Sequence, residues 1–276
     1  MSQWHSPSRL DRVPAKRGEA DLEAAWARAV VMAVDLEDRV SAEAGRPVSV
    51  RDPGERQEDD VYLGQVAGRP WFARPVERIE GASMSWREAT EGQLDAVAAA
   101  LFLTKWARTR PTCERCGGPT GPDQGGARRV CPACGQLAFA RMDPSIIVAI
   151  TDPADRLLLA RNVAWAANRV SIIAGFIEAG ESAEQACHRE VFEEVGVRLE
   201  ELSYVGSQPW PQPRSLMLGF AARAVDSRID VDGDEIVAGA YYSRADLAAA
   251  VSSGELVLPG GASIARHLIE RWISAG

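Results

Sequence analysis

The segment 175–197, GFIEAGESAEQACHREVFEEVGV, constrains the fold of this chain more than any other part of it. It opens with two glycines, which permit tight backbone turns, and continues with Ser182 and Glu184, which are typical of a helix N-terminus. Gly196 is typical of the position at which a helix ends. We therefore expect a loop followed by a helix that runs from near Ser182 to Val195.

Three glutamates lie on one face of this expected helix. Glu190 is three residues before Glu193 and four before Glu194, so the carboxylates project from neighbouring positions. Carboxylates this close repel one another unless a cation lies among them, and a set of ligands made only of oxygen atoms suits Mg²⁺ or Mn²⁺. The same spacing is typical of a solvated acidic helix face, so the spacing alone leaves both interpretations open.

Four of the five cysteines form two C-x2-C pairs, a pattern that predicts a metal site rather than disulfides in a cytoplasmic protein. These four are Cys113, Cys116, Cys131 and Cys134. Fourteen residues, mostly turn formers, separate the pairs, so both pairs can direct their thiolates at one tetrahedral Zn²⁺. We expect a structural zinc ribbon over residues 111–138. The fifth cysteine, Cys187, is expected to be a small core residue.

The composition is that of a globular protein, with 46% hydrophobic and 25% charged residues in a chain of 276. The first twenty residues lack the apolar centre of a secretory signal, and no apolar run is long enough to cross a bilayer. We therefore expect a cytoplasmic protein. The formal net charge of −8 argues against a broad nucleic-acid surface, but less against a compact phosphate ligand held by a metal.

Residues 1–110 are expected to form an N-terminal α+β domain without obvious chemistry. Residues 21–40 carry apolar groups at a helical period, and residues 94–109 are rich in alanine and leucine, so we expect a helix in each. Residues 61–76 instead predict two strands around a turn at Gly68.

Residues 139–276 are expected to form an α/β domain. The apolar runs 145–150, 157–160 and 169–176 predict strands before the acidic helix, and further strands and a final helix over 262–274 follow it. Strands that flank one acidic helix, with a second helix at the end, predict an α/β/α sandwich with a mixed sheet.

The acidic segment resembles the Nudix box, G-x5-E-x7-R-E-U-x-E-E-x-G-U, in which U is an aliphatic residue. It matches all nine fixed positions: Gly175, Glu181, Arg189, Glu190, Val191, Glu193, Glu194, Gly196 and Val197. The chain is therefore similar to Nudix hydrolases, which implies cleavage of the pyrophosphate in a nucleoside diphosphate joined to another group. We expect Arg189 to face away from Glu190 and to pair with Glu181, which would hold the loop against the helix.

The segment 207–215, SQPWPQPRS, resembles the SQPWPFPxS motif of the NADH pyrophosphatase (NudC-like) branch of that family, which also carries a four-cysteine ribbon upstream. The likeness covers roughly residues 61–276. It implies a homodimer that hydrolyses NAD(H)-type dinucleotides, with Mg²⁺ or Mn²⁺, to a nicotinamide-type mononucleotide and AMP. Zn²⁺ would be structural.

The resemblance also implies roles for single residues. The catalytic Mg²⁺ or Mn²⁺ would be held by the carbonyl of Ala174 and by the side chains of Glu190, Glu193, Glu194 and Glu235. We interpret Glu194 or Glu193 as the general base. Residues implied in substrate binding are Phe139, Phe176, Gln208, Pro209, Trp210, Pro211, Gln212, Pro213, Arg214, Ser215 and Ala265.

Two departures from the branch pattern bear on the substrate. Gln212 stands where the motif has Phe, and Phe139 begins the segment FAR where the branch usually has Tyr-Pro-Arg. Both changes alter shape and hydrogen bonding where the nicotinamide half is expected. NADH, NAD and a modified NAD therefore stay open. Three other functions also stay open: a tailoring enzyme in a biosynthetic pathway, an enzyme that removes an NAD cap from RNA, and a catalytically silent nucleotide sensor. The intact acids argue against the sensor.

Overall fold

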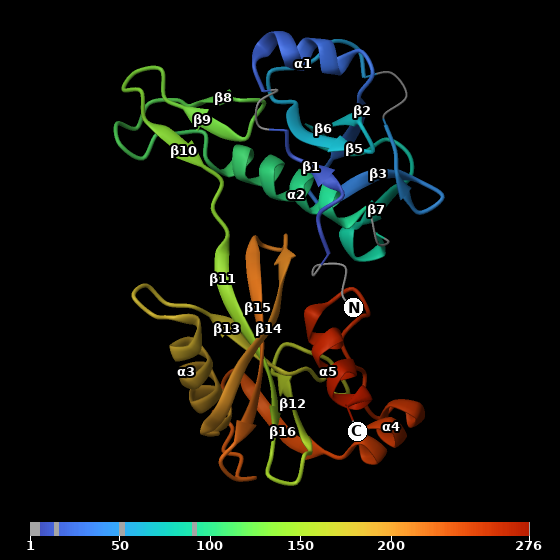
Figure 1. Cartoon of the computed structure of the whole chain (residues 1–276), viewed down its shortest axis with the longest axis vertical. Helices are drawn as coiled ribbons and strands as arrows, with labels where there is room; N and C mark the ends of the chain where they lie inside the picture. Colours follow the sequence, from blue (N-terminus) through green and yellow to red (C-terminus); the bar gives the residue numbers. More distant parts are fainter. Residues whose placement is uncertain (1–5, 14–16, 50–52, 90–92, 276) are drawn as a thin grey trace. The chain divides into compact units, whose positions relative to one another are not determined.

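The structure is a computed structural model that describes residues 6–13, 17–49, 53–89 and 93–275 (Figure 1). These residues fall into two compact units. The N-terminal unit comprises Ser6–Met142 and Pro211–Arg214, and the C-terminal unit comprises Asp143–Trp210 and Ser215–Gly276. Within the described residues, no helix is both long and apolar enough to cross a membrane.

The N-terminal unit contains a seven-stranded sheet in the order β1-β5-β6-β2-β3-β4, with β7 paired to β3. Its strands are β1 (Leu10–Asp11), β2 (Val30–Val34), β3 (Arg39–Glu43), β4 (Arg46–Pro47), β5 (Val61–Val66), β6 (Arg69–Pro75) and β7 (Ser83–Ser85). Its helices are α1 (Glu19–Trp26), the 3-10 turn η3 (Trp86–Glu88) and α2 (Leu94–Thr109). The predicted hairpin around Gly68 and the predicted alanine-rich helix α2 are both confirmed.

The expected helix over residues 21–40 is wrong in its second half. Helix α1 ends at Trp26, and residues 30–34 form β2, which is buried along its whole length. The run VVMAV lies between β6, with which it is parallel, and β3. A strand covered on both faces shows a continuous apolar run rather than alternation, and periodicity cannot distinguish such a run from a buried helix.

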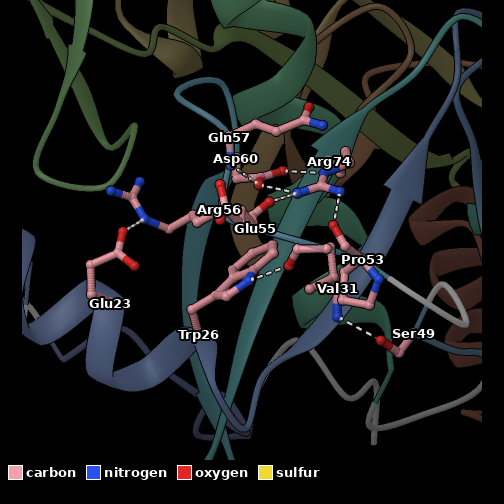
Figure 2. A network of polar contacts seen from close by, with 11 residues as sticks. Glu23, Trp26, Val31, Ser49, Pro53, Glu55, Arg56, Gln57, Asp60 and Arg74 are labelled. Atoms are coloured by element: carbon pink, nitrogen blue, oxygen red, sulfur yellow. Dashed lines mark hydrogen bonds and ion pairs between the residues drawn. The ribbon is translucent and has the colours of Figure 1, made fainter.

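A buried ion pair fixes the loop 53–60 to the sheet of the N-terminal unit (Figure 2). Arg74 on β6 donates from Nε to Asp60 Oδ1 at 2.8 Å and from Nη2 to Asp60 Oδ2 at 2.5 Å. The same guanidinium donates to the carbonyls of Pro53 and Glu55. The pair is therefore bidentate and well supplied with hydrogen bonds, which is the condition under which two charges can be buried together.

A separate three-stranded antiparallel sheet, in the order β10-β9-β8, follows α2 in the same unit. Its strands are β8 (Gly121–Asp123), β9 (Arg128–Val130) and β10 (Leu137–Phe139). All four paired cysteines lie in the turns that flank these short strands.

The C-terminal unit is built on a six-stranded sheet in the order β14-β15-β11-β12-β16, with β13 paired to β11. Its strands are β11 (Asp143–Thr151), β12 (Leu157–Asn162), β13 (Ile173–Phe176), β14 (Leu199–Trp210), β15 (Ser215–Ala224) and β16 (Ile236–Tyr242). Strands β11 and β15 are parallel and the other pairs are antiparallel, so the sheet is mixed, as predicted.

Helices cover both faces of this sheet (Figure 1). Helix α3 (Ala183–Val195) packs on the face that carries Ile146, whereas α4 (Arg244–Ser253) and α5 (Ile264–Ser274) pack on the face that carries Ile147. Neighbouring residues of β11 thus enter different cores, because successive side chains of a strand point to opposite faces. The predicted α/β/α sandwich is confirmed.

Cys187 on α3 belongs to the first of these cores and is fully buried. Burial raises the pKa of its thiol to about 12, so the thiolate needed for nucleophilic chemistry is scarce at neutral pH. The prediction of a small core residue is confirmed.

Candidate active site

Helix α3 begins and ends where the sequence predicts. Ser182 Oγ accepts a hydrogen bond from the backbone N–H of Gln185 at 3.2 Å, and Gln185 Oε1 accepts one from the backbone N–H of Ser182 at 2.8 Å, which forms a capping box. At the other end, Gly196 adopts the left-handed conformation with φ +66°. These caps fix the helix whose second half carries Glu190, Glu193 and Glu194.

Gly175 lets β13 approach the acidic helix closely. A Cβ added at this position would lie 2.0 Å from Cδ of Glu190, which is far inside van der Waals contact. The Glu190 carboxyl group therefore packs directly on the strand that also contains Ala174. The φ angle of Gly175 is not positive, so its backbone conformation does not require a glycine. The missing side chain is what allows the close approach.

Arg189 joins the loop to the helix, as predicted. Its Nε and Nη2 donate to Oε1 and Oε2 of Glu181 at 2.7 and 2.8 Å, and Nη2 also donates to the carbonyl of Phe176 at 2.9 Å. The hydrogen bonds from Arg189 lower the pKa of Glu181 to about 2. The pairing of Arg189 with Glu181 is confirmed.

The expectation that Arg189 faces away from Glu190 is wrong. Nη1 of Arg189 lies 2.9 Å from Glu190 Oε1 and 3.0 Å from Glu193 Oε2. A guanidinium has five N–H donors on a long stem, so one arginine can hold the loop carboxylate on one edge and two helix carboxylates on the other. Arg189 is thus part of the acidic cluster as well as of the loop.

Glu194 is the most buried of the helix acids, with 5% of its surface exposed. Burial, together with the negative charges of Glu235 and Glu190, raises its pKa to about 8. Burial also raises the pKa of Glu190, although Arg189 opposes the shift. Buried carboxylates that destabilise one another in this way fit a hard divalent cation, which would relieve the repulsion.

Within the described residues, the cysteines are the one set of His, Cys, Asp or Glu side chains gathered tightly enough to hold a metal as they stand. The helix glutamates are less closely gathered than these cysteines, and Arg189 forms ion pairs with Glu190 and Glu193. The donor chemistry of the glutamates fits Mg²⁺ or Mn²⁺.

Glu235 is presented by a turn that Asp232 builds. Oδ1 of Asp232 accepts hydrogen bonds from the backbone N–H groups of Asp234, Glu235 and Ile236 at 3.2, 3.3 and 2.8 Å. The carbonyl of Glu235 accepts a hydrogen bond from the backbone N–H of Val163 at 2.9 Å. Sequence reasoning missed Asp232, although the pattern Asp-Gly-Asp is a turn signal that could have identified it.

A cavity of about 240 Å³ in the C-terminal unit adjoins the acids. Five predicted site residues line it together: Ala174, Glu194, Trp210, Glu235 and Ala265. Five polar or aromatic residues that sequence reasoning did not select also line it: Asn162, Trp165, Arg169, Ser171 and Ser263. Four of these lie in or next to the loop after β12, which has no motif to mark it.

Gln208 supports one wall of this cavity from behind. Its side chain is fully buried; Nε2 donates to the carbonyl of Ala262 at 2.7 Å, and Oε1 accepts from the backbone N–H of Ile264 at 2.6 Å. The amide therefore holds the N-terminus of α5, beside Ala265. A direct contact of Gln208 with substrate stays a prediction.

The other expected substrate contacts divide between the units. Phe176, Pro209 and Ser215 lie in the C-terminal unit, where Phe176 is exposed and Ser215 is buried. Phe139, Pro211, Gln212, Pro213 and Arg214 belong to the N-terminal unit. There the Gln212 Oε1 accepts a hydrogen bond from Arg87 Nη1 at 2.6 Å. Contact of these residues with substrate stays a prediction.

The four paired cysteines converge as a zinc site requires. Their Sγ atoms all lie within 4.8 Å of one another, with 3.7 Å between Cys113 and Cys134 and 3.5 Å between Cys116 and Cys131. Each pair sits on a tight turn in which Gly117 or Gly135 has a positive φ. Four convergent thiols without an oxygen ligand suit a closed tetrahedral Zn²⁺ site.

Comparison with known proteins gives a consistent picture. Residues 141–259 match the NUDIX domain family model. The chain is 35% identical over 302 residues to proteins named "NAD-capped RNA hydrolase NudC" from Mycobacterium bovis (strain BCG / Pasteur 1173P2) and Mycobacterium tuberculosis (strain ATCC 25618 / H37Rv), across 98% of this chain and 96% of each relative. A protein of the same name from Pseudomonas entomophila is 36% identical over 236 residues, which cover 81% of this chain and 82% of the relative.

Proposed function

Because the chain belongs to the Nudix hydrolase family, in its NudC-like branch, we propose that this pyrophosphohydrolase splits NAD(H)-type dinucleotides into a nicotinamide-type mononucleotide and AMP. One observation carries the proposal: the cavity of about 240 Å³ is lined at once by two acids, Glu194 and Glu235, and by the aromatic side chain of Trp210. An aromatic pocket with an acidic edge suits a nucleoside whose diphosphate extends toward bound cations.

The acids Glu190, Glu193, Glu194 and Glu235, with the carbonyl of Ala174, would hold Mg²⁺ or Mn²⁺. When bound, such a metal neutralises the diphosphate and lowers the pKa of a coordinated water. Of the chain's own groups, Glu194 or Glu193 would accept the proton of the attacking water.

Two supporting groups keep this arrangement in place. The ion pair between Arg189 and Glu181 holds the loop against α3, and Gln208 holds the first turn of α5 beside the cavity. Neither group needs to touch the substrate to matter, because small displacements of the reacting groups cost large factors in rate.

Replacing one acid tests the catalytic assignment. Glu194→Gln is expected to lower turnover by about two orders of magnitude or more, because the neutral amide holds a cation more weakly than a carboxylate and cannot act as a general base. The variant and the wild type would be incubated with NADH, NAD, ADP-ribose and a diadenosine compound in saturating Mg²⁺, and AMP release followed by chromatography. Glu184→Gln, a change in the first turn of the same helix, is the matched control. Near-normal rates for Glu194→Gln would refute the assignment.

A second candidate substrate is favoured by the relatives, which are named as hydrolases of NAD-capped RNA. A short transcript with an NAD cap would be offered in competition with free NAD. Preference for the free dinucleotide is expected, because the net charge of −8 disfavours a polyanion. Strong inhibition of NAD cleavage by the capped transcript would make RNA the better substrate. The homodimer implied by the resemblance stays a prediction.

A further inference from the structure

Arg169 is a cation on the cavity wall for which the proposed reaction has no use. Its guanidinium carbon lies 5.1 Å from the centroid of the Trp165 ring, and both side chains line the cavity that contains Glu194. Within the described residues, the guanidinium has no carboxylate partner. Stacking on an aromatic ring orients an arginine but leaves the N–H groups at its edge free to bind an acceptor.

The backbone on both sides of Arg169 is fixed. The N–H of Val170 donates to the carbonyl of Val257 at 3.1 Å, and the N–H of Val257 donates to the carbonyl of Asn168 at 2.7 Å. The N–H of Arg169 itself donates to the carbonyl of Ala166 at 3.0 Å. The side chain therefore starts from a fixed point beside the cavity, so little conformational freedom of the backbone would be lost on binding.

A second positive feature borders the same cavity. The first residues of α5 line it, and a helix N-terminus carries a partial positive charge. Gln208 accepts from the N–H of Ile264, and Ser263 Oγ accepts from the N–H of Arg266. Within the described residues, the N–H of Ala265 between them has no acceptor. The lining of the cavity thus includes the acid Glu194 and two features that favour an anion, Arg169 and the first residues of α5.

The size of the cavity limits what can bind there. Pockets that hold a whole drug-sized ligand are roughly 300–1,000 Å³, and this cavity is about 240 Å³. It suits one heteroaromatic ring with part of its sugar rather than an entire dinucleotide. If the diphosphate lies at Glu194, as the proposed function requires, the ring enters the remainder of the cavity, whose lining includes Arg169.

We propose that Arg169 recognises a carboxylate on this ring, so that the preferred substrate is a dinucleotide whose pyridine carries a carboxylate in place of the carboxamide. The inference rests on the proposed function and names its substrate class. A guanidinium offers only donors; a carboxylate presents two acceptor oxygens to it, whereas a carboxamide presents one acceptor and an NH₂ group that cannot pair. Such a site discriminates between two ligands of nearly identical shape.

The test compares two substrates that differ only at this group, NAD and nicotinic acid adenine dinucleotide. The ratio of their kcat/KM values is expected to favour the acid by roughly tenfold or more. Arg169→Gln should remove this preference by lowering kcat/KM for the acid much more than kcat/KM for NAD. Arg169→Lys should retain part of it, because the charge remains without the planar fork.

The matched control is Arg198→Gln. Arg198 also lies over an aromatic ring, 5.9 Å from the centroid of Phe192, but does not line the cavity, so its replacement should leave the preference intact.

Two outcomes would overturn the inference. One is equal use of both dinucleotides by the wild type. The other is an equal loss for both in Arg169→Gln, which would mean that Arg169 contacts a phosphate common to the two. Titration calorimetry with nicotinate mononucleotide and nicotinamide mononucleotide compares their binding affinities and so tests recognition of the carboxylate by Arg169 without turnover. Absence of AMP release from every dinucleotide would refute the proposed function instead, and tighter binding of nicotinate mononucleotide would still support the role of Arg169.

Discussion

At the scale of single residues, the motif positions of this chain divide into those that carry charge and those that make room for it. Gly175 has no chemistry of its own, yet the Glu190 carboxyl group occupies the space that a side chain there would need. Arg189 holds both Glu181 and two helix acids. Fixed positions in the motif therefore reflect packing as much as catalysis.

Gly175→Ala tests the packing role. The added methyl would displace Glu190, because its position lies 2.0 Å from Cδ of that residue. We expect turnover to fall at least about tenfold and the free energy of unfolding to fall by about 1–3 kcal/mol, measured by AMP release and urea denaturation. Gly260→Ala, where an added Cβ has no neighbour within 4 Å, is the control. Wild-type turnover in Gly175→Ala would contradict the role.

The ion pair between Arg189 and Glu181 predicts a pH dependence of stability. The pKa of Glu181 is lowered to about 2 in the folded state, whereas an unfolded glutamate titrates near about 4.3. Its contribution is therefore complete above the unfolded pKa and is lost as the pH falls through the folded pKa. Chemical denaturation between pH 6 and pH 2 should show a smaller decline for Glu181→Gln than for the wild type. Parallel curves would argue against the pair.

At the scale of elements, short segments become rigid where side chains or metals fix them. The strands of the three-stranded sheet contain three residues each, too few to be stable alone. We propose that a Zn²⁺ held by the four cysteines beside them supplies the missing constraint. In the same unit, the ion pair between Arg74 and Asp60 constrains the loop 53–60.

Removal of one cysteine tests the zinc site. The wild type is expected to contain one Zn²⁺ per chain, measured by atomic absorption after dialysis, and Cys131→Ser should lose it because a closed tetrahedral site needs all four ligands. Cys187→Ser should retain the metal, since Cys187 lies in the core of the other unit. Full zinc content in Cys131→Ser would exclude the four-cysteine site.

The buried pair in Figure 2 predicts a large loss of stability. Asp60→Ala leaves the charge of Arg74 largely buried without its partner, which is expected to cost about 3–5 kcal/mol of unfolding free energy in the N-terminal unit. Glu23→Gln removes an exposed carboxylate, but Arg56 retains its ion pair with Glu19. This change should lower the free energy of unfolding by less than about 1 kcal/mol. Similar losses for the two variants would contradict the distinction.

At the scale of the whole molecule, the chain combines an acidic composition with a site for an anionic substrate. Its net charge is −8, so the attraction for a diphosphate has to come from local features rather than from the overall field. Bound cations at Glu190, Glu193 and Glu194 would supply it at one edge of the cavity. Arg169 and the N-terminus of α5 also line the cavity and would favour a further anionic group of the substrate.

The sequence by itself determined the features that depend on short spacing. The limits of α3 and its acidic face follow from residues a few positions apart, because helix periodicity and capping are local. The pairing of Glu181 with Arg189 and the convergence of the cysteine pairs also depend on short segments, of 9 and 22 residues respectively. The mixed sheet followed from the order of apolar runs. The strand at residues 30–34 could not be predicted from the sequence, because its burial on both faces removes the alternation of apolar and polar residues that marks a strand.

Only the tertiary structure decided which residues share the cavity. Arg169 and Trp165 lie on a loop after β12, Glu194 lies in the last turn of the acidic helix, and Ala265 lies in the first turn of α5. No spacing rule connects these segments, since the sheet brings them together through strands that are far apart in the chain. The same holds for Gln208, whose amide binds backbone groups 54 and 56 residues away. Local patterns indicated the reaction, and long-range packing brought together the groups to which we assign the choice of substrate.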